Sequence, residues 1–126
     1  MPASDALDLS GLRILVVEDS LLVADMVAEV LRDYGCTVVG PVPRLDQGLA
    51  FADREQLDGA LLDVNLAGER CFPIAALLAT RGVPFAFLTG YGEAAIPPEY
   101  RDAARLSKPF NIAHLMDLVG RFDRSA

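Results

Sequence analysis

The chain has 126 residues, of which 52% are hydrophobic, and this is enough for a single domain with a buried core. Its 18 acidic and 11 basic side chains give a formal net charge of -7, which argues against nucleic acid as a partner, because phosphate binding requires a basic face. Two cysteines and one histidine are too few for a disulfide framework or a zinc site. We expect no secretory signal and no membrane span, because the first residues lack a basic stretch followed by an apolar run, and no apolar run approaches about 20 residues.

We expect the protein to be cytoplasmic. The N-terminal part of its sequence predicts a tail, a strand and a helix. Residues 1–11 are polar and predict a flexible tail. Residues 12–17 form an apolar, β-branched run that is typical of a strand buried on both faces. Apolar side chains at three- and four-residue spacing then predict a helix over residues 22–34, with Asp19 or Ser20 as its cap.

The same alternation of strand and helix continues to the C-terminus. One helix is weak, because residues 92–103 contain two adjacent prolines and no apolar stripe, so we expect a short or irregular segment there. Five strands joined by helical crossovers predict a doubly wound, five-stranded parallel sheet in one α/β domain over residues 12–126. The remaining strands are expected at 37–39, 60–63, 83–88 and 104–107, and the remaining helices at 45–52, 74–80 and 112–122.

Polar side chains interrupt this pattern where the strands end. Glu18 and Asp19 follow the first strand, Asp63 ends the third, Thr89 ends the fourth, and Lys108, the only lysine, follows the fifth. The carboxyl ends of parallel strands meet at one edge of a sheet, where ligands bind at the switch point of the topology. We therefore expect these five side chains to line one shallow cleft.

Electrostatics indicates what the cleft binds. Two unit charges about 4 Å apart repel by about 4 kcal/mol at an effective dielectric constant near 20, so three carboxylates would cost on the order of 10 kcal/mol. One lysine offsets only part of this repulsion. A hard divalent cation with oxygen ligands would offset the rest, and Mg²⁺ beside a carboxylate nucleophile, a hydroxyl and a lysine indicates phosphoryl transfer.

Four short blocks now resemble those of a known family. They are Val16-Val17-Glu18-Asp19, Leu62-Asp63-Val64-Asn65, Leu88-Thr89-Gly90 and Ser107-Lys108-Pro109-Phe110. In this order and spacing they resemble the receiver domain of two-component response regulators, over about residues 12–124. The resemblance implies the flavodoxin-like (βα)5 receiver fold of single-domain, chemotaxis-type regulators.

The resemblance also implies a role for each acidic residue. Asp63 would be the nucleophile that accepts a phosphoryl group from a sensor histidine kinase, a histidine phosphotransfer protein or a small phosphodonor. Asp19, Asp63 and the backbone carbonyl of Asn65 would hold Mg²⁺, with Glu18 acting directly or through water.

The same resemblance assigns the basic and hydroxyl residues. Lys108 would pair with Asp63 at rest and with a phosphoryl oxygen afterwards, and Thr89 would move toward the phosphoryl group as the switching event. The Lys108-Pro109 bond would be a cis peptide that turns the lysine into the cleft.

One departure from the family pattern concerns the switch. Many receivers have an aromatic residue three positions before the lysine, where this chain has Arg105. Tyr91 lies instead in a Phe-x-Thr-Gly-x-Tyr-like loop of the kind that marks a receiver subgroup. We hypothesise that Tyr91 takes over the switch role and that residues 92–103 become ordered on phosphorylation. By the resemblance, Asn65 and Tyr91 would also control access of water to the aspartyl phosphate.

Other functions remain open at this point. A magnesium-dependent phosphohydrolase usually needs a second aspartate two residues after the nucleophile, where this chain has Asn65. A nucleotide- or flavin-binding module needs a glycine-rich turn, which is absent after the first strand. A receiver could also act as a phosphate sink or as a scaffold that is never phosphorylated. We expect a stand-alone regulator, monomeric or weakly dimeric, that signals to an unidentified protein and is not a turnover enzyme.

Overall fold

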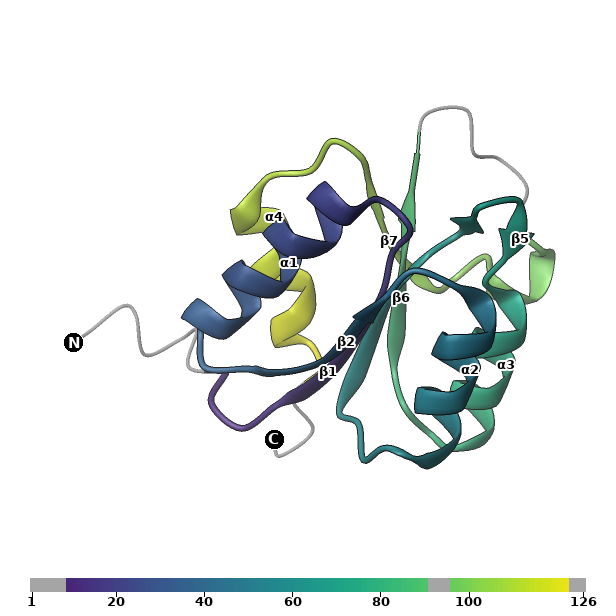
Figure 1. The fold of residues 1–126 in the computed structure, drawn as a ribbon, viewed down its shortest axis with the longest axis horizontal. Coiled ribbons are helices and arrows are strands. Elements are labelled where there is room, and N and C mark those ends of the chain that lie inside the picture. Colours follow the sequence, from purple (N-terminus) through teal and green to yellow (C-terminus); the bar gives the residue numbers. More distant parts are fainter. Residues whose placement is uncertain (1–8, 91–95, 123–126) are drawn as a thin grey trace.

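The computed structural model describes residues 9–90 and 96–122, which fold into a parallel sheet between two layers of helices (Figure 1). The strand order is β2-β1-β3-β6-β7, and all four strand pairs are parallel. The chain therefore winds outward in both directions from β1, which places the switch point between β1 and β3. The strands are β1 (Arg13–Val17), β2 (Thr37–Val42), β3 (Gly59–Asp63), β6 (Phe85–Thr89) and β7 (Ala104–Ser107).

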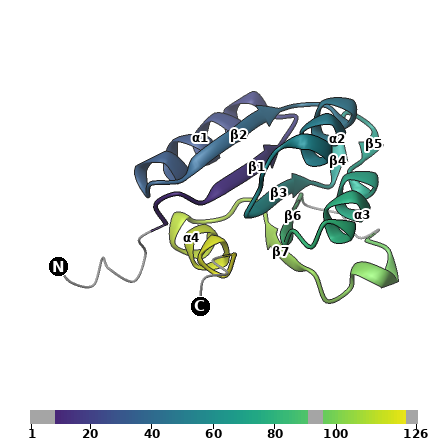
Figure 2. The same ribbon diagram turned by 90° about the horizontal axis from the view of Figure 1, so that it is seen from below.

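Two helices cover each face of the sheet, as Figures 1 and 2 show. Helices α1 (Leu21–Asp33) and α4 (Ile112–Gly120) pack on one face, and α2 (Leu45–Arg54) and α3 (Phe72–Thr80) pack on the other. The fold is thus the predicted doubly wound α/β fold of receivers. Among the described residues, no helix combines the length and the apolar character that crossing a bilayer would require.

The first strand confirms the reading of its apolar run as a doubly buried strand. Ile14 and Val16 point into the core beneath α1 and α4, whereas Leu15 and Val17 point into the core beneath α2 and α3. All four side chains are fully buried. Because successive residues of a strand face opposite sides, only a continuous apolar run can fill both cores at once.

Ser20, one of the two expected caps, begins helix α1. Its hydroxyl accepts a hydrogen bond from the backbone N–H of Val23 at 3.3 Å, which satisfies one of the free N–H groups of the first turn. Ser20 and the acidic residues before it are therefore held at fixed positions above the end of β1.

The described part of the crossover between β6 and β7 contains no α-helix, in line with the short or irregular segment expected from the two prolines. Its described part, residues 96–103, contains a single 3₁₀ turn, Pro98–Tyr100. The ring of Tyr100 stacks on Phe72 and packs edge-on against Phe85 and Phe87, with ring centroids 5.7–6.0 Å apart. An aromatic cluster thus covers this part of the sheet in place of a regular helix.

The structure corrects one expectation at the N-terminus and adds one element. Residues 9–11 were assigned to the flexible tail, but Leu9 is buried in the core and its N–H donates to the carbonyl of Tyr34. The scattered apolar residues of this stretch have no helical or strand periodicity, yet Leu9 packs in the core beneath α1 and α4. The added element is a hairpin of β4 (Asn65–Leu66) and β5 (Glu69–Arg70), which the sequence analysis did not predict.

Candidate functional site

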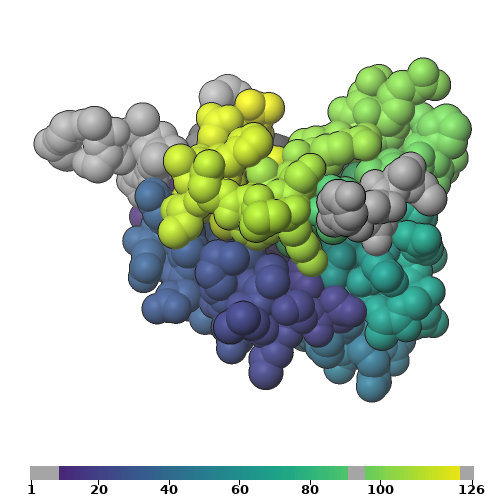
Figure 3. Space-filling model, turned by 90° about the horizontal axis from the view of Figure 1, so that it is seen from above, coloured from purple at the N-terminus to yellow at the C-terminus, as the bar shows by residue number. Residues whose placement is uncertain are grey.

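The expected cleft residues meet at the edge of the sheet formed by the carboxyl ends of the strands. Glu18 and Asp19 follow β1, Asp63 ends β3, Thr89 ends β6 and Lys108 follows β7. Figure 3 looks down on this edge, where the segment leading into α4 lies against the start of α1. Glu18, Asp63 and Thr89 are the buried polar side chains of residues 9–90 and 96–122, and their exposures are 1%, 5% and 6%. Burial of polar groups is therefore concentrated here.

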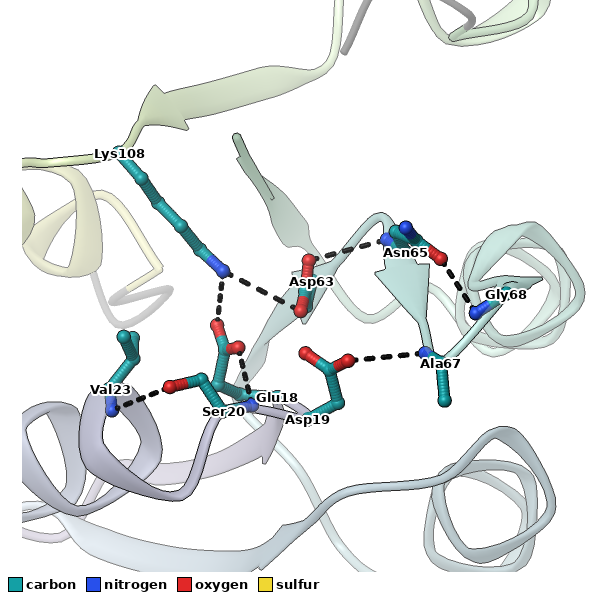
Figure 4. Close-up of polar contacts among 9 residues, drawn as sticks. All are labelled: Glu18, Asp19, Ser20, Val23, Asp63, Asn65, Ala67, Gly68 and Lys108. Atoms are coloured by element: carbon teal, nitrogen blue, oxygen red, sulfur yellow. Dashed lines mark hydrogen bonds and ion pairs between the residues drawn. The ribbon is translucent and has the colours of Figure 1, made fainter. Parts of the chain in front are cut away.

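Lys108 bridges two of the carboxylates, as Figure 4 shows. Its Nζ lies 2.8 Å from Oε1 of Glu18 and 3.5 Å from Oδ2 of Asp63. The contact with Asp63 is the resting pair that the resemblance implies, and the structure adds a shorter contact with Glu18. The backbone N–H of Lys108 donates to the carbonyl of Thr89 at 2.7 Å, and the Lys108-Pro109 peptide is cis.

Both oxygens of Glu18 have partners. Oε1 pairs with Lys108, and Oε2 accepts a hydrogen bond from the N–H of Ser20 at 3.0 Å. Asp19, by contrast, is exposed, and its Oδ2 accepts a hydrogen bond from Ala67 N–H at 3.1 Å. Asp63 accepts from Asn65 N–H through Oδ1 at 3.2 Å. The two aspartates therefore present the freer oxygens of the cleft.

The carboxylates perturb one another strongly. The pKa of Asp63 is raised to about 8, first by burial and then by hydrogen bonds with Asp19 and Glu18 and the charge of Glu18. The charge of Lys108 acts in the opposite direction. Burial acts to raise the pKa of Asp19 as well, but hydrogen bonds with Asp63 and Ala67 and the charge of Lys108 lower it overall. Without a cation, the cleft therefore favours the protonated form of Asp63 and the ionised form of Asp19, because it has little positive charge to balance its carboxylates.

The acidic cluster fits the Mg²⁺ that the sequence predicts. Glu18, Asp19 and Asp63 each offer a carboxylate oxygen, and these oxygens lie within 4.8 Å of one another. An all-oxygen donor set with excess negative charge suits a hard divalent cation. Asp19 and Asp63 have the freer oxygens for it, whereas Glu18 is engaged by Lys108 and Ser20, and the role of the Asn65 carbonyl stays a prediction.

Comparison with known proteins decides the family. The model of the response regulator receiver domain matches residues 14–120, which is most of the chain. The chain belongs to this family. Its members are signalling domains of two-component systems rather than turnover enzymes.

Two solved structures are similar to the chain. The chain is 36% identical to SdrG from Sphingomonas melonis Fr1, with a TM-score of 0.80 over 88% of this chain and 95% of that one. It is 25% identical to the receiver domain of the sensor histidine kinase PA1611 from Pseudomonas aeruginosa PAO1, with a TM-score of 0.75 over 90% and 98%. That structure has a magnesium ion coordinated in its active site cleft.

A longer regulator is also similar. The chain is 28% identical over 122 residues to the transcriptional regulatory protein PdtaR of Mycobacterium tuberculosis, which covers 94% of this chain and 60% of PdtaR. The chain therefore spans about three fifths of that relative's length.

Of the two residues that bear on the switch hypothesis, the structure describes Arg105 but not Tyr91. Tyr91 lies outside the described residues, so its switch role stays a prediction. Arg105 is on β7, and its Nη2 donates to the backbone carbonyls of Tyr100 and Arg101 at 3.2 and 3.0 Å. The arginine thus ties β7 to the 3₁₀ turn, a contact that no pattern in the sequence indicates.

Proposed function

We propose that the chain is a response regulator that accepts a phosphoryl group on Asp63 from a sensor histidine kinase or a histidine phosphotransfer protein. The observation that carries this proposal is the convergence of a buried carboxylate, an ammonium 3.5 Å away and a threonine on the next strand, beside a second carboxylate that is free to bind a cation. Family membership and the magnesium in the PA1611 receiver support the same reading.

Each residue has a definite task in the transfer. Asp63 gives up its proton, and an oxygen of its carboxylate attacks the phosphorus. A new O–P bond forms as the N–P bond of the donor phosphohistidine breaks, and the leaving imidazole keeps the electron pair of that bond and takes up a proton. Lys108 neutralises charge on the phosphoryl oxygens, and the Thr89 hydroxyl donates a hydrogen bond to one of them. Mg²⁺, held by Asp19, Asp63 and the Asn65 carbonyl, supplies further charge neutralisation when bound.

The family context also suggests the output. We infer a regulator that slowly loses its phosphoryl group to water and acts through protein contacts, because the signalling step of receivers is a change of surface rather than turnover. Phosphate sink and non-phosphorylated scaffold are the alternatives that experiment must separate. The carboxamide at position 65 cannot act as the general acid that an aspartate would provide in a phosphohydrolase.

Phosphorylation of the purified chain tests the proposal. The chain is incubated with Mg²⁺ and acetyl phosphate, then with each histidine kinase of the source organism, and the product is followed by intact mass and Phos-tag gels. We expect one phosphoryl group on the wild type, none on Asp63→Asn, and the wild-type result for Asp25→Asn, an exposed aspartate of α1. Equal labelling of Asp63→Asn, or no labelling by any donor, contradicts the proposal, and the second result favours a scaffold.

A further inference from the structure

The unpredicted β4–β5 hairpin holds both aspartates of the cleft through its backbone (Figure 4). The N–H of Asn65 donates to Oδ1 of Asp63 at 3.2 Å, and the N–H of Ala67 donates to Oδ2 of Asp19 at 3.1 Å. Asp19 comes from the end of β1, 48 positions earlier in the chain than Ala67. The hairpin is thus the structural link between the two carboxylates that would bind a cation.

The turn of this hairpin has an unusual backbone. Leu66 and Glu69 are paired, so Ala67 and Gly68 form a two-residue turn, and both have positive φ, 54° and 95°. Such a turn usually has asparagine, aspartate or glycine at its first position, because a Cβ atom disfavours the left-handed region. Ala67 therefore adopts this conformation only because its surroundings hold it there.

Two contacts fix the turn. Leu66 is fully buried in the core beneath α2 and α3, which anchors the first strand of the hairpin. The carboxamide oxygen of Asn65 accepts a hydrogen bond from the N–H of Gly68 at 2.9 Å, which closes the loop across the strained alanine. The resemblance suggested that the Asn65 side chain controls water at the phosphorylation site, but here its oxygen is bonded to the hairpin.

We propose that Asn65 is a positioning residue whose side chain holds the turn that directs the Ala67 N–H at Asp19. With Oδ2 of Asp19 held in this way, its other oxygen lies on the side of Asp63, as Figure 4 shows. The carboxamide thereby sets the spacing of the two carboxylates for a divalent cation. This inference rests on the proposed function, since it concerns the Mg²⁺ site of that proposal.

Two substitutions at position 65 separate the side chain from the backbone. Asn65→Ala keeps the backbone N–H and carbonyl but removes the acceptor for Gly68, so the turn relaxes and Asp19 loses its fixed orientation. Loss of such an outer hydrogen bond typically weakens metal binding by 10- to 100-fold, and we expect Mg²⁺ affinity to fall about tenfold. Asn65→Ser retains a hydroxyl acceptor close to the backbone, and we expect affinity within about threefold of wild type.

Asn111 provides a matched control. Its carboxamide oxygen also accepts from a backbone N–H three residues later, that of His114 at 2.7 Å, but it caps α4 and contacts neither aspartate. Mg²⁺ affinity is measured by calorimetric titration of the full chain with MgCl₂ alone, and the melting temperature is recorded in EDTA. Asn111→Ala should lower the melting temperature and leave the affinity unchanged, whereas Asn65→Ala should lower the affinity.

Each outcome has a distinct meaning. Wild-type affinity in Asn65→Ala, or an equal loss in Asn111→Ala, overturns the positioning role while the proposed function stands. Failure of Asn65→Ser to recover affinity likewise overturns it, because the acceptor would not be what matters. A wild-type chain that binds no Mg²⁺ overturns this inference together with the metal site of the proposed function, and phosphorylation of Asp63 then tests the remainder separately.

Discussion

Replacing Asp63 by asparagine removes one of three carboxylates that the fold brings together around a single ammonium group. At an effective dielectric constant of about 20, each of the two neighbouring carboxylates, within 4.8 Å, repels Asp63 by about 3.5 kcal/mol or more. Lys108, 3.5 Å away, attracts it by about 5 kcal/mol. The repulsions exceed the attraction by about 2 kcal/mol, before the cost of burying the charge is counted.

The sign of this effect depends on pH. The pKa of Asp63 is about 8 in the folded protein and near 4 in the unfolded chain, so the unfolded chain releases this proton first. The metal-free fold is therefore penalised progressively as pH rises from about 4, and the penalty is complete above about 8. Asp63→Asn lacks this penalty, and at pH 9 we expect its free energy of unfolding to exceed that of the wild type by at least about 2 kcal/mol, since the cost of burying the charge adds to this repulsion.

Thermal unfolding in EDTA measures the difference. For a chain of this length, 2 kcal/mol corresponds to a rise in melting temperature of about 8 °C. Asp25→Asn, an exposed matched control, should stay within about 2 °C of wild type. Addition of Mg²⁺ should then stabilise the wild type and leave Asp63→Asn almost unchanged. A melting temperature of Asp63→Asn in EDTA at or below that of the wild type would refute the electrostatic reasoning.

Three further predictions concern the cleft and the core beside it. Because a cation competes with the proton on Asp63, Mg²⁺ affinity in calorimetric titrations should rise about tenfold per pH unit up to about pH 8 and then level off. An affinity that stays constant from about pH 6 to 9 would contradict this competition. Lys108→Met leaves the buried carboxylate of Glu18 without its partner and should lower the free energy of unfolding in urea by about 3–5 kcal/mol. An unchanged urea midpoint would show that this ion pair contributes nothing to stability. Gly59→Ala would place a methyl group against the buried ring of Phe122 and should cost about 1–3 kcal/mol, and an unchanged urea midpoint would show that the ring moves freely.

The sequence by itself determined the architecture and the location of the site. The continuous apolar run at 12–17 could be satisfied only by a strand with a core on each face, and the helical periodicities between the strands required parallel crossovers. Polar residues at strand ends then had to meet at one edge of the sheet. Even the irregular fourth crossover could be expected from its two prolines, because proline lacks the N–H that a helix interior requires.

The tertiary structure alone decided which groups touch within that site. Lys108 lies closer to Glu18 than to Asp63, since the burial of Glu18 makes its charge the more costly one to leave unpaired. The β4–β5 hairpin escaped prediction because its strands are two residues long, too short for a periodic pattern. Its hydrogen bond to Asp19 joins positions 48 residues apart, and no local propensity encodes such a contact. Local pattern thus placed the carboxylates at one edge, and packing set their spacing and their proton affinities.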